Sequence, residues 1–228
     1  MLSFNHLKFT SFLQRNKSFF IFILLMSVFR SAVADWYSVP TGSMQPTIKI
    51  GDRVVVDKMA YNLRLPFTKL NLASLNTPAR GDIIVFDSEA AKQRLIKRVI
   101  GLPGDTISMK EDIVFVNGKP LNYYPLSSKT QGNSSLASNL ETLGEITHSI
   151  NINTNANLRL RGFAAVKVPA GHYLVLGDNR RNSADSRVHG FIPHKELLGK
   201  ATSIAFSVNY NNYYIPRTNR LFLDIYDI

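Results

Sequence analysis

The chain of 228 residues contains no cysteine. This absence excludes disulfides, zinc sites with thiolate ligands and a cysteine nucleophile, and it is compatible with a reducing or an oxidising compartment. Acidic residues are also scarce, because 16 Asp and Glu stand against 27 Lys and Arg, which gives a net charge of +11. Such an excess favours an anionic partner. Since the basic residues are scattered rather than gathered in runs, an anionic membrane surface is a better candidate than nucleic acid.

Long apolar runs are absent except near the N-terminus. Residues 1–17 are basic and lack acids, and the stretch from Phe19 to Phe29 is almost entirely apolar. Two interpretations fit: a secretory signal cleaved at Ala32-Val-Ala34, or a membrane anchor over residues 18–34 with the basic segment in the cytoplasm. The run approaches the about 20 residues of a full span only if Arg30 extends its side chain to the interface. In both cases the rest of the chain lies outside the cytoplasm, which argues further against nucleic acid.

Sustained helical periodicity is absent from the remainder of the chain. Short runs of β-branched and aromatic residues alternate with turn sequences rich in Gly, Pro, Asn and Asp, which is typical of strands. We therefore predict a mainly all-β fold with an antiparallel sheet. Residues 120–160 are rich in Ser, Asn and Thr, and we expect an inserted, smaller β subdomain or excursion there. The catalytic or binding β domain is then expected over residues 35–119 and 161–228.

Ser43 lies in the loop from Val39 to Ile48, which reads Val-Pro-Thr-Gly-Ser-Met-Gln-Pro-Thr-Ile. Proline fixes φ and lacks a backbone donor, so Pro40 and Pro46 keep this stretch out of a helix interior. Gly42 permits a close approach of the backbone to another group. A serine in such a loop is a turn residue or a nucleophile, and the turn residue is the commoner case. The distinction depends on a neighbouring base that can take the hydroxyl proton.

A lysine can be that base, since no histidine has a setting that favours the role. A catalytic lysine must be neutral near pH 7, so its pKa has to fall by several units. In the strand predicted over residues 94–100, alternation places Lys97 on one face with Leu95 and Val99. An apolar face penalises the charged amine and lowers its pKa. The alternative is an edge strand whose lysine reaches water.

The third informative stretch, after the Ser43 loop and the Lys97 strand, is polar. It runs from Gly177 to Arg187, and its two aspartates are interleaved with three arginines. The arginines compete for the carboxylates, so no metal site is predicted there. The sequence indicates no cofactor either. We expect a self-satisfied hydrogen-bond network that holds a rigid loop.

Together and in this order, these stretches resemble the bacterial type I signal peptidases. The similarity runs from about Arg30 to about Ala205. The matching segments are Pro40–Thr47, Arg80–Phe86, Lys97–Asp105 and Gly177–Arg187. The resemblance implies a membrane-anchored serine endopeptidase that removes signal peptides from exported preproteins after small residues in an Ala-x-Ala pattern. It also implies a retained anchor, with the enzyme in the bacterial inner membrane and its catalytic domain on the periplasmic face.

The resemblance implies a role in the reaction for four residues. Ser43 is the expected nucleophile and Lys97 the expected general base, which later serves as the acid toward the leaving amine. The Ser43 N–H and the Thr41 hydroxyl are expected to bind the oxyanion. Threonine stands where many relatives carry serine, which keeps the donor but restricts its rotamer. Ser183 is expected to orient the Lys97 amine.

The other matched residues are expected to bind substrate or to support the fold. Shallow pockets for the first and third residues before the cut are expected to be lined by Val39, Pro40, Met44 and Ile96. Strand alternation places Ile96 opposite Lys97, so its pocket role requires a bulge or twist in the strand. Two ion pairs are expected to be structural: Arg98 with Asp178, and Asp185 with Arg187.

Two further interpretations stay open on the sequence alone. One is a more specialised Ser/Lys peptidase, of the kind that processes conjugation pilins, with a narrow set of substrates. The other is a non-catalytic, secreted β-sheet binding protein whose N-terminal segment is removed. The sequence does not determine the oligomeric state, and we expect a monomer.

Overall fold

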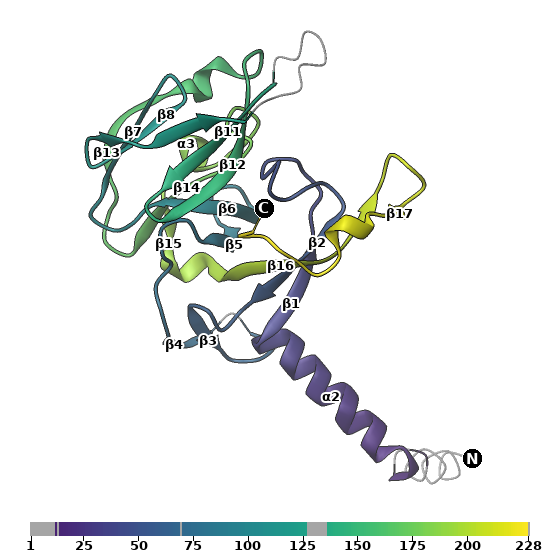
Figure 1. Cartoon of the computed structure of the whole chain (residues 1–228). Coiled ribbons are helices and arrows are strands. Elements are labelled where there is room, and N and C mark those ends of the chain that lie inside the picture. The colour runs from purple at the N-terminus through teal and green to yellow at the C-terminus, as the bar shows by residue number, and fades with distance from the viewer. Residues whose placement is uncertain (1–11, 13, 69, 127–135, 228) are drawn as a thin grey trace.

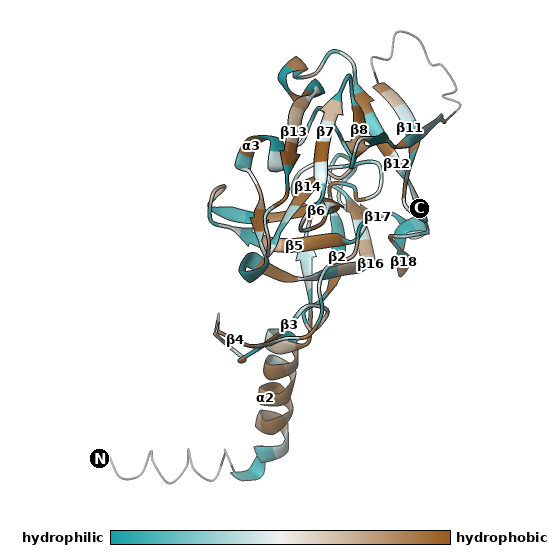
Figure 2. Cartoon of the chain, turned by 90° about the vertical axis from the view of Figure 1, so that its left-hand side faces the viewer, coloured by the Kyte–Doolittle hydropathy of each residue, from teal (hydrophilic) through white to brown (hydrophobic). Residues whose placement is uncertain are grey.

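The computed structural model describes residues 12, 14–68, 70–126 and 136–227. Antiparallel strands dominate and helices are few, which confirms the predicted fold class (Figure 1). The longest helix described, α2 (Lys17–Ala32), extends away from the body of the molecule (Figures 1 and 2). Its apolar side chains are mostly exposed.

The helix α2 stands where the sequence predicts a membrane anchor over residues 18–34. It has 16 residues, and among the described residues no helix is both long and apolar enough to cross a membrane. The spanning helix that we predicted is therefore not found in this part of the chain. Hydrogen bonds join the end of α2 to the body, because the Lys58 N–H donates to the Val33 carbonyl and the Lys58 amine donates to the Arg30 carbonyl, both over 2.8 Å.

The main sheet has nine strands, and all their pairings are antiparallel. In chain order they are β1 (Ala34–Ser38), β2 (Asp52–Asp57), β5 (Ile83–Ser88), β6 (Gln93–Gly101), β14 (His172–Leu176), β15 (Ile192–Pro193), β16 (Leu197–Asn209), β17 (Ile215–Pro216) and β18 (Leu223–Asp224). Along the sheet the order is β1-β2-β16-β5-β6-β14-β15, and β17 and β18 pair with β16 beside this path. The strand β1 therefore lies at an edge.

Three smaller sheets accompany the main one. A four-stranded sheet contains β7 (Thr106–Lys110), β8 (Ile113–Val116), β9 (Lys119–Pro120) and β13 (Phe163–Lys167). A three-stranded sheet contains β10 (Asn122–Pro125), β11 (Leu136–Leu143) and β12 (Ile146–Asn153), and a two-stranded sheet contains β3 (Asn62–Arg64) and β4 (Asn71–Ser74). The four- and three-stranded sheets lie at the end of the molecule away from α2 (Figure 1).

The three-stranded sheet falls within residues 120–160, for which we predict an inserted β subdomain, although residues 127–135 of that range lie outside the described residues. The neighbouring four-stranded sheet combines strands from both predicted parts of the larger domain. The strands β7, β8 and β9 lie at the end of the range 35–119, with β9 extending to Pro120, and β13 lies in the range 161–228. Short helices complete the fold: α3 (Ser186–His189) and the 3₁₀ turns Leu158–Arg161, His194–Glu196 and Thr218–Arg220.

The core consists of three apolar clusters, and β6 contributes to all of them. The alternation predicted for this strand is observed, because Leu95 and Val99 pack in one cluster while Ile96 packs against another. The cluster on the Ile96 side also contains Val39 and Met44 of the loop Val39–Ile48, which carries Ser43 and is called the serine loop below. Burial of these side chains fixes the serine loop against the main sheet.

Candidate active site

Ser43 is half-buried in the loop between β1 and β2, next to Met44, whose buried side chain fixes the loop to the core. The loop is also held from the polar stretch that follows β14. The Asn179 N–H donates to the Ser43 carbonyl over 3.0 Å, and the Asn179 side-chain amide donates to the Gly42 carbonyl over 3.0 Å. These bonds fix the backbone on which the Ser43 hydroxyl stands.

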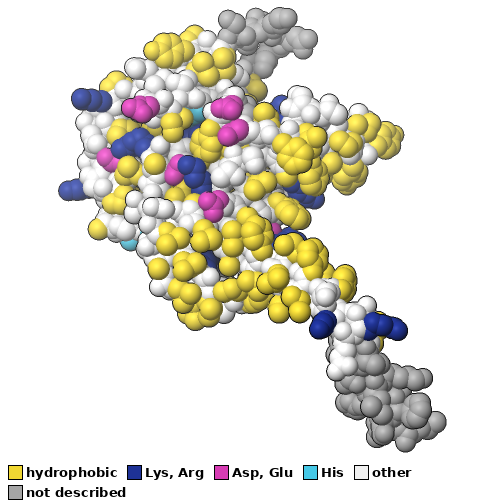
Figure 3. All heavy atoms as spheres, turned by 60° about the horizontal axis from the view of Figure 1, so that its bottom comes forward, with side chains coloured by type: hydrophobic (Ala, Val, Ile, Leu, Met, Phe, Trp, Pro, Cys, Tyr) yellow, Lys and Arg dark blue, Asp and Glu magenta, His cyan; other side chains and the backbone are white. Residues whose placement is uncertain are grey.

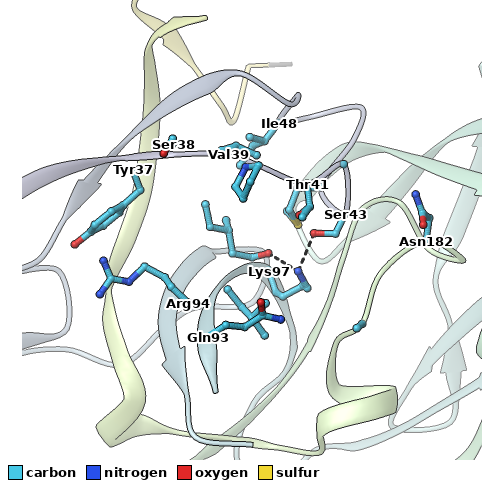
Figure 4. Close-up of a pocket in the computed structure, with 16 residues that line it drawn as sticks. Tyr37, Ser38, Val39, Thr41, Ser43, Ile48, Gln93, Arg94, Lys97 and Asn182 are labelled. Atoms are coloured by element: carbon cyan, nitrogen blue, oxygen red, sulfur yellow. Dashed lines mark hydrogen bonds between the residues drawn. The ribbon is translucent and has the colours of Figure 1, made fainter. Parts of the chain in front are cut away.

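Lys97 extends from β6 toward Ser43. Its amine lies 2.9 Å from the Ser43 Oγ and 2.9 Å from the Ile96 carbonyl oxygen, within hydrogen-bond distance of both (Figure 4). The residue is only 2% exposed. Burial lowers the pKa of Lys97 to about 8, while the carboxylates of Asp185 and Asp178 act in the opposite direction. A buried amine with this pKa is partly neutral at physiological pH.

Ser183 is close to these residues but does not contact the Lys97 amine. Its Oγ is buried and has no hydrogen-bond partner among the described residues. A methyl group added to Gly177 would lie 2.2 Å from the Ser183 Oγ and 2.4 Å from the Ser43 carbonyl oxygen, so this packing requires glycine. The expected hydrogen bond between Ser183 and the Lys97 amine is therefore not found among the described residues, and the second partner of that amine is the Ile96 carbonyl.

Arg98, the residue after Lys97 on β6, pairs with Asp178. Two hydrogen bonds of 2.9 and 2.8 Å join them, and the two side chains are 1% and 0% exposed. Burial alone would raise the pKa of Asp178, but the Arg98 guanidinium and the Thr47 hydroxyl, 2.6 Å away, hold that pKa below its usual value. Because Thr47 belongs to the serine loop, this buried pair connects the loop to β6.

Asp185 and Arg187 form the other predicted pair. The Arg187 guanidinium donates to both carboxylate oxygens of Asp185, over 2.8 and 2.7 Å. The Gly177 N–H donates to Asp185 over 3.0 Å, and Arg187 also donates to the Arg180 carbonyl over 2.5 Å. A hydrogen-bond network is therefore present in this polar stretch, but it is not fully self-satisfied, because the buried Ser183 Oγ has no partner among the described residues.

A cavity of about 520 Å³ opens beside Ser43 and Lys97. Thr41 and the four residues expected to form substrate pockets also line it: Val39, Pro40, Met44 and Ile96 (Figure 4). Ile96 and Lys97 border the same cavity although they alternate along β6. The reason is that β14 pairs with β6 only from Arg98 onward, so the cavity lies against the open edge of the strand.

Two buried residues beside this arrangement, Glu141 and His148, were not predicted from the sequence. Glu141 of β11 forms a buried ion pair with Arg180, and His148 of β12 lies 3.4 Å from Glu141 and 3.9 Å from Asp178. Burial and the nearby Arg98 lower the pKa of His148. Both residues come from the polar range 120–160, whose composition gave no sign of burial. The role of Asn179 was missed for a similar reason, since it depends on a contact between distant segments.

Within the described part of the chain, no group of three or more His, Cys, Asp or Glu side chains is placed to hold a metal ion.

Comparison with known proteins extends over most of the chain. A family model described as signal peptidase, peptidase S26, matches residues 12–206. A signal peptidase I of Pseudomonas aeruginosa is 34% identical over 203 residues, which cover 84% of this chain and 71% of that protein. The signal peptidase I T of Bacillus subtilis is 32% identical over 204 residues, which cover 89% of each. A solved structure of a signal peptidase I from Enterococcus faecalis is 30% identical and covers 57% of this chain and 100% of that one, with a TM-score of 0.36. The family model and the Pseudomonas and Bacillus relatives show that the chain belongs to the signal peptidase family, peptidase S26, and is a serine peptidase.

Proposed function

We propose that Ser43 and Lys97 form the catalytic pair with which this peptidase cleaves signal peptides from exported preproteins. The observation that supports the pair is the distance of 2.9 Å between the Lys97 amine and the Ser43 Oγ in a buried setting. A serine hydroxyl is a weak nucleophile until a base takes its proton. Burial, which lowers the pKa of Lys97 to about 8, supplies a neutral amine that can do so.

In the proposed reaction the Ser43 Oγ attacks the scissile carbonyl while its proton passes to the Lys97 amine. The oxyanion that forms accepts hydrogen bonds from the Ser43 N–H and the Thr41 hydroxyl, which border the same cavity. The Lys97 ammonium then gives its proton to the leaving amine. A water molecule, activated by the same lysine, hydrolyses the remaining acyl ester and restores the serine.

We further propose that the apolar cavity walls select small residues at the first and third positions before the cut. In an extended peptide these two side chains point to the same face. Val39 and Met44 are buried in the core, so the wall they form cannot recede to admit a large side chain. Together with Pro40 and Ile96 they would leave room for alanine at both positions, which matches an Ala-x-Ala pattern.

Cleavage of a defined preprotein by the purified enzyme tests the proposed function. We expect a single cut directly after the Ala-x-Ala sequence, located by the masses of the two products. Replacing the alanine before the cut by phenylalanine should lower kcat/KM by about 100-fold, because the pocket rejects the larger side chain. A cut at another bond, or unchanged cleavage of the phenylalanine substrate, would contradict the proposal.

The two alternative functions raised by the sequence do not agree equally well with the family membership. A non-catalytic binding protein disagrees with membership of a peptidase family. A specialised peptidase of the pilin-processing kind remains a second candidate, supported by no feature of the cavity in particular. It predicts cleavage of one or a few members of a panel of unrelated preproteins, whereas a general signal peptidase cleaves most of them.

We also propose that α2 holds the enzyme on an anionic bilayer, with the catalytic domain on the periplasmic face of the bacterial inner membrane. The helix is apolar and exposed, and apolar side chains cover much of the face from which it emerges (Figure 3). Arg30 in its last turn stacks 4.7 Å from the centre of the Trp36 ring, a pairing suited to a membrane interface. The nine residues that follow Ala34 and end at Ser43 span at most about 30 Å, so the serine would stay near the bilayer.

Flotation with vesicles that contain anionic phospholipid tests this attachment. The full chain should float with the vesicles, and the double variant Phe22→Asp with Leu25→Asp should remain in the dense fraction, because charged groups in the bilayer are costly. A matched double variant at exposed apolar residues outside α2, Ile113→Asp with Leu158→Asp, should float normally. Equal flotation of both double variants would contradict the role of α2.

A further inference from the structure

A second cavity, of about 450 Å³, continues the one that contains Ser43. Tyr37 and Arg94 line both cavities, so they mark the boundary between them. Beyond this boundary the second cavity reaches Ser31 in the last turn of α2 and Phe67 in the loop between β3 and β4. The two cavities therefore lead from the serine to the point where α2 joins the body.

The boundary residues form a stacked pair. The Arg94 guanidinium lies 4.5 Å from the centre of the Tyr37 ring and donates to both oxygens of Asp87, over 2.8 and 3.1 Å. In Figure 4 this pair and Asn182 lie at opposite ends of the first cavity, with Ser43 between them. A peptide in the first cavity that continues away from Asn182 must pass the stacked pair.

The order of residues along the two bordering segments gives the direction of this path. Along β6, Ile96 and Arg94 precede Lys97, and Figure 4 shows Lys97 between Arg94 and Ser43. Going back along the chain from Ser43, the order is Val39 and then Tyr37. The residues proposed to receive the side chains before the cut thus lie between the catalytic pair and the stacked pair. The part of a substrate that reaches Arg94 is therefore the part upstream of the cut.

Free strand edges border this path. The strand β1 lies at the end of the main sheet, and among the described strands only β5 pairs with residues 93–97 of β6. An extended peptide can form main-chain hydrogen bonds to such edges. Because a strand advances about 3.3 Å per residue, the fourth residue before the cut would lie near Arg94, three positions from Lys97.

We propose that the second cavity binds the segment of the signal peptide from the fourth to about the eighth residue before the cut, and that Tyr37 and Arg94 guide the chain into it. This inference rests on the proposed function. It makes the second cavity a substrate site that determines which residues are accepted between the small residues before the cut and the membrane-embedded part of the signal peptide.

The lining of the second cavity fits polar, uncharged residues. Its basic side chains already have partners: Arg94 bonds Asp87, Lys195 lies 3.2 Å from Glu89, Lys58 lies 3.2 Å from Asp35, and Arg64 donates to the Leu197 carbonyl. A charged residue of the substrate would have to compete with these pairs and lose part of its hydration. A serine, glycine or asparagine of the substrate carries no charge, so it would not compete with these ion pairs and would lose less hydration than a charged residue.

Two peptides with the same cleavage site test the inference. The short one begins with an acetyl group three residues before the cut, and the long one begins eight residues before it, with Gly and Ser in the added positions. The wild-type enzyme should cleave the long peptide with a kcat/KM about tenfold higher, mainly through a lower KM. This ratio should fall to about one in Glu89→Trp, which places an indole in the second cavity, and in Arg94→Ala, which removes the stacked pair.

The matched control is Glu145→Trp, which puts the same side chain on an exposed carboxylate position in the turn between β11 and β12. This variant should keep the ratio and the activity of the wild type. A wild-type ratio near one, or a ratio that stays near ten in both cavity variants, would overturn the inference while the proposed function stands. If the wild-type enzyme cleaves neither peptide nor a full preprotein, the proposed function itself fails.

Discussion

Replacing Lys97 by methionine should lower kcat for signal-peptide cleavage by at least about 10⁴-fold, and Ser43→Ala should have an equally large effect. Methionine keeps the length and most of the apolar stem of lysine but lacks the amine, so the buried site stays filled. The Ser43 hydroxyl then loses the one base within hydrogen-bond distance among the described residues. Because serine and lysine act as a unit, the double variant should be no less active than either single variant.

Two control measurements are needed to interpret this loss of activity. The Lys97→Met protein should unfold at a denaturant concentration close to that of the wild type, which shows that the fold survives. A matched variant of an exposed lysine on β9, Lys119→Met, should cleave at the wild-type rate. If Lys97→Met cleaves within tenfold of the wild type, another group takes the proton and the proposed pair is wrong.

The same base predicts a pH dependence. Only the neutral amine of Lys97 can accept the serine proton, and burial lowers its pKa to about 8. The value of kcat/KM should therefore rise about tenfold per pH unit below pH 8 and become constant above it. In Ser43→Ala, NMR titration of the Lys97 side chain should report the same pKa directly. Titration near the ordinary lysine value of about 10.4 would contradict the proposed base.

The features predicted correctly from the sequence are those that depend on local signals. A period of two places Leu95 and Val99 on one face and Ile96 on the other, because pleating alone decides this in a strand. Turn residues and β-branched runs were sufficient for the antiparallel fold. The predicted membrane-spanning helix was not found, because α2 has 16 residues and no helix among the described residues is long and apolar enough to cross a membrane.

The features that could not be predicted depend on contacts between distant segments. Glu141 and His148 are polar residues in a polar stretch, and only the packing of the three-stranded sheet against the loop after β14 buries them. The partner of the Lys97 amine is another case. Strand alternation indicates a buried lysine, but it does not predict that the amine bonds the Ile96 carbonyl while the Ser183 Oγ stays without a partner among the described residues.

The second large effect is expected at the buried pair below the serine loop. Asp178→Asn should lower the free energy of unfolding by about 3–5 kcal/mol, because it leaves the Arg98 guanidinium buried without a balancing charge. The matched change in an exposed pair, Asp87→Asn beside Arg94, should cost at most about 1 kcal/mol. Denaturant unfolding of both variants measures the two values.

A double variant separates the loss of the pair from a general disturbance at this position. If the cost arises from an unbalanced charge, removing that charge as well, in Asp178→Asn with Arg98→Met, should recover part of the stability lost in the single variant. If the double variant is instead less stable by the sum of two large losses, the two residues contribute independently. Because the Thr47 hydroxyl donates to Asp178, such a result would also mean that Asp178 stabilises the protein mainly through its bond to the serine loop rather than through Arg98.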